Sequence, residues 1–296
     1  MSAEAARFES IFRPGLFAGQ VCLITGGGTG IGRCIAHELA ALGATSIVLG
    51  RREHVLSETV SEIVAAGGRA EYEVSDIRDE EAVGSAVSRI CDRHGRIDGL
   101  VNNAGGQFPS PAAALSPKGW RAVVDLNLTG TFQVSRAVYD ASMSRHGGKI
   151  VSIVAPVQRG FPMFAHSGAA RAGVINLTST LASEWAGDGV RVNAVAPGIT
   201  LTGGLDQYPP EQLKALSREL EAAPVARFGT ESEISAAVVF LLSPAAALLT
   251  GVTLQADGGG GLARMGVRNA RPKGALEAFN GFQFARSAPA EQNSDE

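Results

Sequence analysis

A glycine-rich loop between a short apolar run and a helical pattern is the feature that most constrains this chain. The apolar run Val21–Thr25 leads into this loop, which contains Gly26, Gly28, Thr29, Gly30, Ile31 and Gly32. Glycine permits a tight turn and lets the backbone approach a pyrophosphate, while the start of the next helix offers free N–H groups to the anion. We therefore expect a strand–loop–helix unit that binds a dinucleotide.

Short apolar runs alternate with longer segments of helical period along the rest of the chain. This alternation is typical of a parallel sheet that is covered by helices on both faces. Seven strands are predicted, at Val21–Thr25, Ser46–Gly50, Ala70–Val74, Leu100–Asn103, Lys149–Val154, Arg191–Val195 and Thr253–Gln255. The predicted fold is α/β, a Rossmann-type doubly wound seven-stranded parallel sheet in a single domain.

Three segments depart from this alternation. Residues 1–15 are predicted to be an N-terminal extension of the 16–260 domain. Residues 200–222, which contain one pair of glycines and one pair of prolines, are predicted to form a mobile substrate lobe beside the strand ends. The polar residues 261–296 are predicted to be a partly disordered tail. Alternatively, a partner subunit orders the lobe and the tail.

The composition argues against several classes of function. The 26 basic and 29 acidic residues are mixed along the chain, so no nucleic-acid partner is expected. Apolar runs fall short of the roughly 20 residues of a membrane helix, and no signal peptide is predicted. The three cysteines lack metal-ligand spacing. We expect a reduced, cytoplasmic protein with no metal site and no membrane partner.

The residues after the second predicted strand indicate which dinucleotide binds. A carboxylate at this position binds the ribose hydroxyls and disfavours a 2′-phosphate, but here the strand ends in Gly50, Arg51 and Arg52. Because a guanidinium matches a phosphate in bidentate geometry, the expected cofactor is NADP(H). The alternative is two solvated arginines at a helix start.

Four motifs together resemble the short-chain dehydrogenase/reductase family over Leu16–Gly260. They are TGGGTGIG at 25–32, NNAG at 102–105, NLTGTF at 127–132 and RVNAVAPGIT at 191–200. The segments GGQFPSPAAALSPKGW, GFPMFAHSGAARAGVINLT and FLLSPAAALLTG resemble peroxisomal trans-2-enoyl-CoA reductases, and next 2,4-dienoyl-CoA reductases. This resemblance implies NADPH-dependent reduction of a conjugated acyl thioester by a homotetramer, built partly by helices within Ser116–His146 and Phe164–Trp185.

The resemblance also implies which residues hold the cofactor. It places adenine recognition at Asp76 and Ile77, at the end of a predicted strand. The residues expected to border the ribose and nicotinamide are Asn103, Ala104 and Gly105, and those expected to hold the carboxamide are Pro197, Gly198, Thr200 and Thr202. All lie at or just beyond predicted strand ends, where α/β sheets bind ligands.

The catalytic positions differ from those of most of the family. Asn127 matches the usual Asn, but Val154 replaces the usual Ser, Ser167 replaces the Tyr and Arg171 replaces the Lys. The resemblance to the enoyl-CoA reductases includes the HSGAARAG string. This chain differs at Ile175, where the enoyl-CoA reductases have a Tyr and the dienoyl-CoA reductases have an Asp. Ser179 follows four residues later.

Two further residues are candidates for the proton donor. His166 is a candidate because histidine is a common proton donor and because it directly precedes Ser167, although a satisfied core histidine is an equal alternative. Tyr208, in the predicted lobe, is a weaker candidate, because a surface aromatic in a proline turn explains it as well.

The residues at the replaced catalytic positions restrict the reactions that this site can catalyse. A serine hydroxyl is a far weaker acid than a phenol, and an arginine stays protonated, so Ser167 and Arg171 can orient and polarise a carbonyl but cannot titrate. Reduction of an enoyl thioester depends less on a strong acid than ketone reduction does. The expected function is enoyl-CoA reduction; the alternatives are a carbonyl reductase and an NADP(H)-binding pseudoenzyme.

Overall fold

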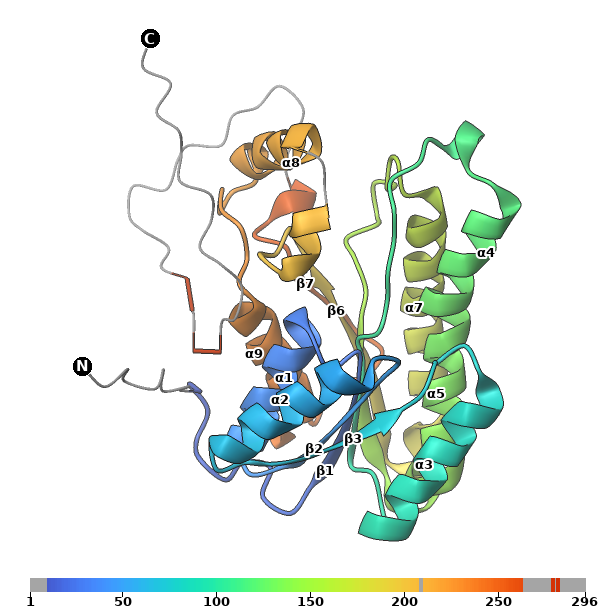
Figure 1. Ribbon diagram of the computed structural model, residues 1–296, viewed down its shortest axis with the longest axis vertical. Helices are drawn as coiled ribbons and strands as arrows, with labels where there is room; N and C mark the ends of the chain where they lie inside the picture. Colours follow the sequence, from blue (N-terminus) through green and yellow to red (C-terminus); the bar gives the residue numbers. More distant parts are fainter. Residues whose placement is uncertain (1–9, 208–209, 263–277, 280, 283–296) are drawn as a thin grey trace, which may run out of the picture.

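A seven-stranded parallel sheet forms the centre of the computed structural model, which describes residues 10–207, 210–262, 278–279 and 281–282 (Figure 1). The strands are β1 (Val21–Thr25), β2 (Thr45–Gly50), β3 (Arg69–Val74), β4 (Gly99–Asn102), β5 (Gly148–Ile153), β6 (Val190–Pro197) and β7 (Thr253–Ala256). Their order is β3-β2-β1-β4-β5-β6-β7, and every neighbouring pair is parallel. The predicted fold class is confirmed, and all seven strands lie where they were predicted, with small shifts at their ends.

The strand order reverses direction between β1 and β4. From β1 the chain first builds outward through β2 and β3, and it then returns to the other side of β1 to build β4 through β7. At such a reversal the loops beyond the carboxyl ends of the two central strands diverge and leave a crevice. The fold therefore places its binding crevice beyond Thr25 and Asn102.

Helices cover both faces of the sheet (Figure 1). One face carries α1 (Gly30–Ala41), α2 (Glu53–Ala65) and α9 (Glu231–Leu242), and the other carries α3 (Glu80–His94), α4 (Pro117–Val124), α5 (Gly130–Val138) and α7 (Ala165–Glu184). The short α6 (Ser144–His146) precedes β5, and α8 (Pro210–Ala222) lies in the predicted lobe. After α8 the backbone of Val225 bonds to Gly258, so the lobe rests beside the end of β7.

Two hydrophobic cores follow from the alternation of side chains along each strand. Cys22 and Ile24 of β1 pack into the core beneath α1 and α9, whereas Leu23 packs into the core beneath α3, α5 and α7. Because helices cover both faces of the sheet, a central strand such as β1 is apolar on both sides. Burial also raises the pKa of the Cys22 thiol to about 12, so this cysteine is a core residue and not a nucleophile.

The helical segment expected within Ser116–His146 contains two π-helical turns. Ser116 caps α4 by accepting a 3.1 Å hydrogen bond from the Gly119 N–H. A π-helical turn, Asp125–Thr129, then separates α4 from α5, and a second one precedes α6. Such turns are frequent at functional sites. The first of them carries Asn127, a predicted site residue.

The described end of the chain is anchored on α9. Phe282 is fully buried, and its backbone N–H donates a 2.7 Å hydrogen bond to Ser232 Oγ. The Thr230 hydroxyl donates a 2.6 Å bond to the carbonyl oxygen of Phe279. The sequence alone predicts only a polar tail in this region and does not indicate this anchor. No helix in the described ranges has the length and apolarity needed to cross a membrane.

Candidate active site

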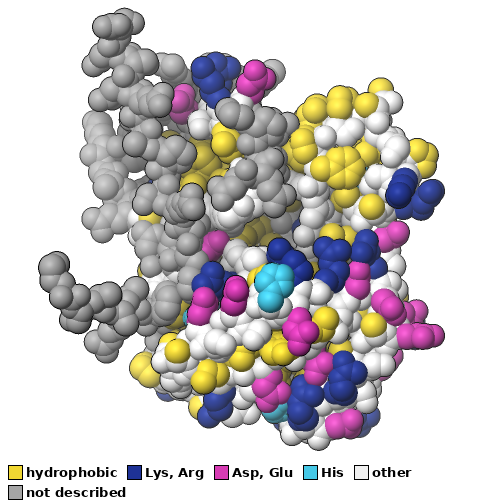
Figure 2. Space-filling view, in the orientation of Figure 1, with side chains coloured by type: hydrophobic (Ala, Val, Ile, Leu, Met, Phe, Trp, Pro, Cys, Tyr) yellow, Lys and Arg dark blue, Asp and Glu magenta, His cyan; other side chains and the backbone are white. Residues whose placement is uncertain are grey.

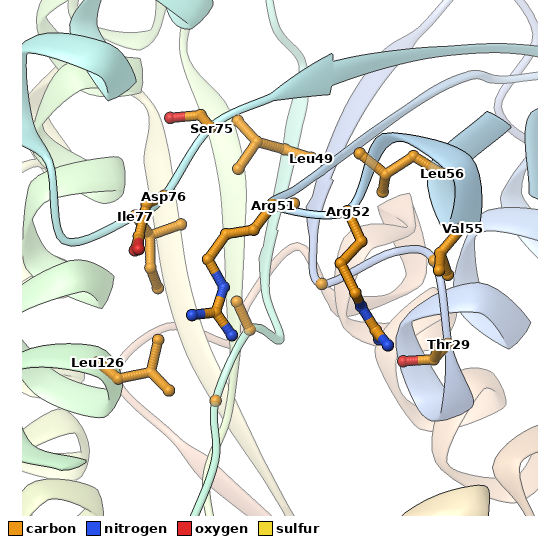
Figure 3. Close-up of a pocket in the computed structure, with 15 residues that line it drawn as sticks. Thr29, Leu49, Arg51, Arg52, Val55, Leu56, Ser75, Asp76, Ile77 and Leu126 are labelled. Atoms are coloured by element: carbon orange, nitrogen blue, oxygen red, sulfur yellow. The ribbon is translucent and has the colours of Figure 1, made fainter. Parts of the chain in front are cut away.

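A pocket opens at the crevice beyond the ends of β1, β2 and β4 (Figure 3). Nine predicted cofactor residues line it: Gly26, Gly28, Thr29, Arg51, Arg52, Asp76, Ile77, Ala104 and Gly105. Its volume of about 160 Å³ is smaller than the roughly 300–1,000 Å³ of a complete ligand site. The pocket therefore covers only part of an extended dinucleotide site, and its lining includes the residues expected at the adenosine half, Arg51, Arg52, Asp76 and Ile77.

The glycine loop and the NNAG segment form one hydrogen-bonded unit. The side-chain amide of Asn103 donates to the backbone oxygens of Thr25 and Gly26, at 3.1 and 3.2 Å. In return, Thr25 Oγ1 accepts the backbone N–H groups of Asn103 and Ala104, each at 3.0 Å. Gly26 needs to be glycine, because its φ is +65° and a Cβ would lie 2.9 Å from the Asn103 amide nitrogen. Asn103 therefore shapes the loop.

The N-terminus of α1 has no side-chain cap from Thr29. Thr29 occupies the N-cap position, but its side chain makes no capping hydrogen bond, and the first turn contains no acidic residue. A 12-residue helix with uncapped N–H groups carries a partial positive charge at this end. The site thus fits the pyrophosphate of a dinucleotide, as expected for Gly30, Ile31 and Gly32.

The predicted carboxamide segment lies beside this helix start. A Cβ on Gly30 would lie 3.8 Å from the Cβ of Thr202. The segment leaves the end of β6, where the Gly198 N–H bonds to Ala256 and the Thr200 hydroxyl donates a 3.1 Å bond to the Gly198 oxygen. Pro197, Gly198, Thr200 and Thr202 therefore lie between the end of β6 and the glycine loop, outside the pocket of Figure 3.

Two arginines border the adenosine half of the site. Arg51 and Arg52 leave the end of β2, are exposed, and form no ion pair with any residue that the structure describes. Figure 3 shows Arg52 extending on the side of Thr29 and Arg51 on the side of Asp76 and Ile77. In Figure 2, dark-blue basic side chains gather across the middle of this face, next to its hollow.

The Asp76 carboxylate does not oppose a phosphate here. It accepts hydrogen bonds from the guanidinium of Arg78 and forms a 2.5 Å ion pair with it. The hydrogen bond from Arg78 lowers the pKa of Asp76, and the charges of Arg78 and Arg51 add to this effect. Arg78 balances the negative charge of Asp76, and Arg51 and Arg52 have no ion-pair partner within the described chain. The site therefore fits a 2′-phosphate.

Asn127 fixes the loop that follows the NNAG motif. Its amide nitrogen donates to the Gly106 oxygen at 2.8 Å, and its oxygen accepts the Gly106 N–H at 3.0 Å. The buried Asn127 also lies against Gly105, where a Cβ would come within 2.6 Å of its oxygen and would overlap the Arg171 guanidinium. The backbone of Gly105 therefore separates two predicted catalytic side chains that approach it together.

Arg171 brings a positive charge into this group. Its Nη1 donates a 2.6 Å hydrogen bond to the backbone oxygen of Ile153, at the end of β5. Burial lowers the pKa of the guanidinium to about 10, and no carboxylate in the described ranges pairs with it. A cation that is shielded from water and has no carboxylate partner stabilises an anion or a developing negative charge beside it.

Ser167 stands one helical turn before Arg171, on the same face of α7. Its buried hydroxyl donates a 2.7 Å hydrogen bond to the side-chain oxygen of Gln107, in the loop after β4. The structure therefore brings Ser167, Arg171 and Asn127 to one place, around the loop 105–107. Gln107 was not predicted, although a polar residue directly after a strand-end motif is a usable signal.

His166 is turned away from this group. Its Nδ1 accepts the Ser167 backbone N–H at 2.7 Å, and its ring makes an edge contact with Phe108 at 4.6 Å between centroids. The buried Nε2 has no hydrogen-bond partner in the described chain. Because Nδ1 accepts, the neutral ring carries its hydrogen on Nε2. No contact joins His166 to the Ser167 hydroxyl within the described residues.

The other replaced positions lie outside the polar group. Val154, at the usual Ser position, is buried in a small apolar cluster with Val174, against which Ile175 packs. Ser179 bonds only weakly, at 3.4 Å, to the Gly251 oxygen. Tyr208 lies outside the described residues. No group of three or more metal-binding side chains occurs in the described part of the chain.

Comparison with known proteins identifies a matching family and several reductase relatives. The family described as enoyl-(acyl carrier protein) reductase matches residues 26–260. The peroxisomal 2,4-dienoyl-CoA reductase of Rattus norvegicus is 38% identical, over 86% of this chain and 88% of its own. A 3-oxoacyl-(acyl-carrier-protein) reductase of Synechocystis sp. is 37% identical, over 81% and 96%. These relatives are dienoyl-CoA and 3-oxoacyl reductases, so they do not support the order of the motif resemblance, which placed the trans-2-enoyl-CoA reductases first and the dienoyl-CoA reductases second.

Solved structures share the fold. The citronellol catabolism dehydrogenase (AtuB) of Pseudomonas aeruginosa PAO1 is 50% identical, with a TM-score of 0.77 over 85% of this chain and 98% of its own. An actinorhodin polyketide ketoreductase solved with NADPH is 32% identical, with a TM-score of 0.77 over 84% and 99%. With its sheet order, its glycine loop and these relatives, this chain belongs to the short-chain dehydrogenase/reductase family of oxidoreductases.

Proposed function

We propose that this protein uses NADPH to reduce a C=C bond conjugated with the carbonyl of an acyl-CoA thioester. The observation that carries the proposal is the composition of the polar group: Ser167, Asn127 and the half-buried guanidinium of Arg171, which no carboxylate pairs, with no phenol among the described residues of the group. Such a group can stabilise negative charge on an oxygen but contains no strong acid.

The chemistry of conjugate reduction matches this composition. NADPH supplies a hydride to the end of the conjugated system, which moves the displaced electron pair onto the thioester oxygen. The Ser167 hydroxyl can donate a hydrogen bond to that oxygen, and Arg171 lowers the energy of its negative charge. Water then delivers a proton to the α-carbon, so the protein needs no acid of its own. In ketone reduction the new alkoxide itself must be protonated.

An apolar rim beside the site suits an acyl chain. Phe108 and Met163 are exposed by 41% and 44%, and their two loops are joined by a 2.7 Å backbone bond from Ser110 to the Met163 oxygen. Trp120 of α4 adds a third aromatic or apolar side chain, exposed by 40%. Figure 2 shows hydrophobic side chains gathered at the upper right, over the end of the molecule that carries α4.

Both trans-2-enoyl-CoA and 2,4-dienoyl-CoA present the required thioester. The segment motifs favour the first, and the named relative from rat favours the second. The test is NADPH oxidation by the purified protein with medium-chain examples of each, and with NADH as the cofactor control. Turnover with either thioester and NADPH supports the proposal; turnover with neither, despite NADPH binding, refutes it.

Two single substitutions test the assignment of residues. Ser167→Ala is expected to lower kcat by about 100-fold, as loss of an oxyanion donor does in other enzymes. His166→Ala is expected to change kcat less than Ser167→Ala does, because the His166 ring faces Phe108. Equal losses in both variants would make His166 a partner in proton delivery. Unchanged turnover in both would remove Ser167 from the mechanism.

Carbonyl reduction is the second candidate. The relative from Synechocystis that carries this activity in its name is 37% identical, which favours it. The same assay with a 3-oxoacyl thioester and a simple ketone separates the two candidates. Reduction of these carbonyls without reduction of the conjugated thioesters would select carbonyl reduction as the function.

A homotetramer is part of the proposal, as the family resemblance implies. Phe132 of α5 is 39% exposed and Trp120 of α4 is 40% exposed, and both helices lie within the Ser116–His146 segment named for the interface. A large apolar side chain exposed on such a face is a usual sign of contact with another protein. Light scattering coupled to size-exclusion chromatography, on the wild type and on Phe132→Glu, tests this assembly.

A further inference from the structure

The Ser167 hydroxyl is committed to a protein acceptor. Its single hydrogen lies in the 2.7 Å bond to Gln107 Oε1, so the same hydrogen cannot at that moment be donated to a substrate oxygen. Ser167 is also fully buried, so water does not compete for the hydroxyl from the outside. For Ser167 to act on a carbonyl, the bond to Gln107 must break or reverse, and only reversal keeps the two side chains hydrogen-bonded.

A glutamine amide is suited to such a reversal. Its oxygen only accepts hydrogen bonds, and its nitrogen only donates them, while both stand at equal distance from the preceding carbon. A half-turn of the Gln107 amide therefore replaces Oε1 by Nε2 opposite Ser167 Oγ. The hydroxyl then accepts from Gln107, and its own hydrogen becomes available to the substrate.

The backbone beneath this side chain is held in place. Gly106, the residue before Gln107, is bonded through both its N–H and its oxygen to the Asn127 amide, at 3.0 and 2.8 Å. Further along the loop, the Ser110 N–H bonds to the Met163 oxygen at 2.7 Å. The fixed backbone keeps the amide of the exposed Gln107 side chain within reach of Ser167.

We propose that Gln107 is a positioning residue that turns its amide when substrate binds, donates to Ser167 and thereby directs the Ser167 hydroxyl to the substrate carbonyl oxygen. A donor chain of this kind strengthens its last hydrogen bond, because each bond polarises the next. Gln107 would thus strengthen a hydroxyl that is a weak donor alone. This inference rests on the proposed function only in taking a carbonyl oxygen as the group that Ser167 contacts.

The decisive variant is Gln107→Glu, which keeps size and length. An ionised carboxylate only accepts, so it holds the Ser167 hydrogen and withholds it from the substrate. A protonated carboxyl, below an ordinary pKa of about 4.3, carries a hydrogen and can donate as the amide does. The activity of Gln107→Glu relative to wild type is therefore expected to be lowest at pH 8 and to rise as the pH falls.

A second variant separates this relay from a mere packing role. Gln107→Met keeps the length and removes both polar atoms, so it neither assists nor captures the hydroxyl. We expect kcat for Gln107→Met to fall about tenfold, as for one lost transition-state hydrogen bond, and by the same factor at every pH. Gln107→Glu should fall further than Gln107→Met at pH 8 and should exceed it at pH 5.

The experiment measures kcat and KM from pH 5 to pH 9 for wild type, both variants, and both combined with Ser167→Ala. In the Ser167→Ala background the pH dependence that is specific to Glu should disappear. Thermal unfolding and NADPH binding, measured for each protein, show that the fold and the cofactor site are retained. A ratio of Gln107→Glu to wild type that does not vary with pH would overturn the relay, as would a pH dependence that survives Ser167→Ala.

The acceptor in these assays is whichever carbonyl compound the wild type reduces. If that is a ketone and not a conjugated thioester, the proposed function fails while the relay is still tested, because both acceptors present an oxygen to Ser167. If wild type reduces neither, both proposals fall.

Discussion

The Asn103 side chain donates a 3.2 Å hydrogen bond to the backbone oxygen of Gly26, and so ties the end of β4 to the glycine loop. Asn103→Leu, of similar size, removes this donor and leaves the Gly26 oxygen without its partner. Loss of one such bond costs about 1–3 kcal/mol. We expect the Kd for NADPH to rise by about tenfold or more, measured by quenching of protein fluorescence.

The neighbouring strand-end residue provides the control for this prediction. Asn102 bonds at 2.9 Å to Ser135 and not to the glycine loop, so Asn102→Leu should lower stability and leave the NADPH affinity nearly unchanged. Equal effects of both substitutions on the Kd would mean that Asn103 does not shape the loop.

Arg51 and Arg52 should determine the preference for NADPH over NADH. Changing both to alanine removes the two guanidinium groups that are unpaired within the described chain, so binding of a 2′-phosphate should weaken, whereas NADH binding should not. Two lost charge-assisted bonds at about 1.5–3 kcal/mol each predict a fall in the NADPH/NADH ratio of kcat/KM of at least about 100-fold.

Arg13 is an exposed arginine that lines no part of the pocket, so Arg13→Ala serves as the control for the change in charge. It should leave the ratio as in wild type. If the double variant kept the wild-type preference, the two arginines would be no more than the start of a solvated helix.

Most of the fold was predictable because it depends on local patterns. Apolar runs buried on both faces mark parallel strands, and the glycine loop identifies β1 and α1 without reference to any other part of the chain. The helical segment within Ser116–His146 was predicted without its π-helical turns. A π-helical turn adds one residue to a helical turn and leaves the apolar spacing nearly unchanged, so periodicity does not reveal it.

The active site was less predictable, because its contacts join distant segments. Ser167 and Gln107 are 60 residues apart, and neither forms a recognisable motif with the other. The direction of the His166 ring depends on Phe108, which approaches from another loop. A sequence shows which side chains follow the strand ends, but the packing of the loops decides which of them meet.

Phe282 should contribute to global stability although it belongs to a polar segment. Its side chain is fully buried, so Phe282→Ala is expected to lower the free energy of unfolding by about 3–5 kcal/mol, as for a phenylalanine removed from a core. Phe279→Ala is the matched control, because the Thr230 bond uses the backbone oxygen of Phe279 and remains. Urea unfolding curves that differ by less than 1 kcal/mol between Phe282→Ala and wild type would exclude a stable anchor.

Glu38 should make stability depend on pH. This buried glutamate accepts hydrogen bonds from Ser10 and Ser235, at 2.7 and 2.5 Å, and burial raises its pKa. The folded state therefore holds the proton more tightly than the unfolded state, so the contribution of Glu38 is most favourable below the ordinary pKa and declines as the pH rises through the raised one.

Glu38→Gln removes this titration and keeps the shape of the side chain. Its stability relative to wild type should increase from pH 4 to pH 7 and then level off, in urea unfolding at each pH. A difference that stays constant over this range would show that Glu38 ionises equally in both states.

Arg171 should carry the charge that stabilises the reduced thioester, and its replacement by lysine should change the pH dependence of kcat. Burial lowers the pKa of Arg171 to about 10, so wild type keeps the charge through pH 9. A lysine starts from an ordinary pKa of about 10.4, below that of arginine, and the same burial lowers it further. Arg171→Lys should therefore approach wild-type kcat near pH 7 and lose activity as the pH rises towards 9, because the amine becomes neutral.

Arg171→Met has no charge at any pH, so its kcat should lie about 100-fold or more below that of wild type at every pH. If Arg171→Met retained wild-type kcat, the buried guanidinium would serve the Ile153 backbone alone, and the charge would have no part in the reaction.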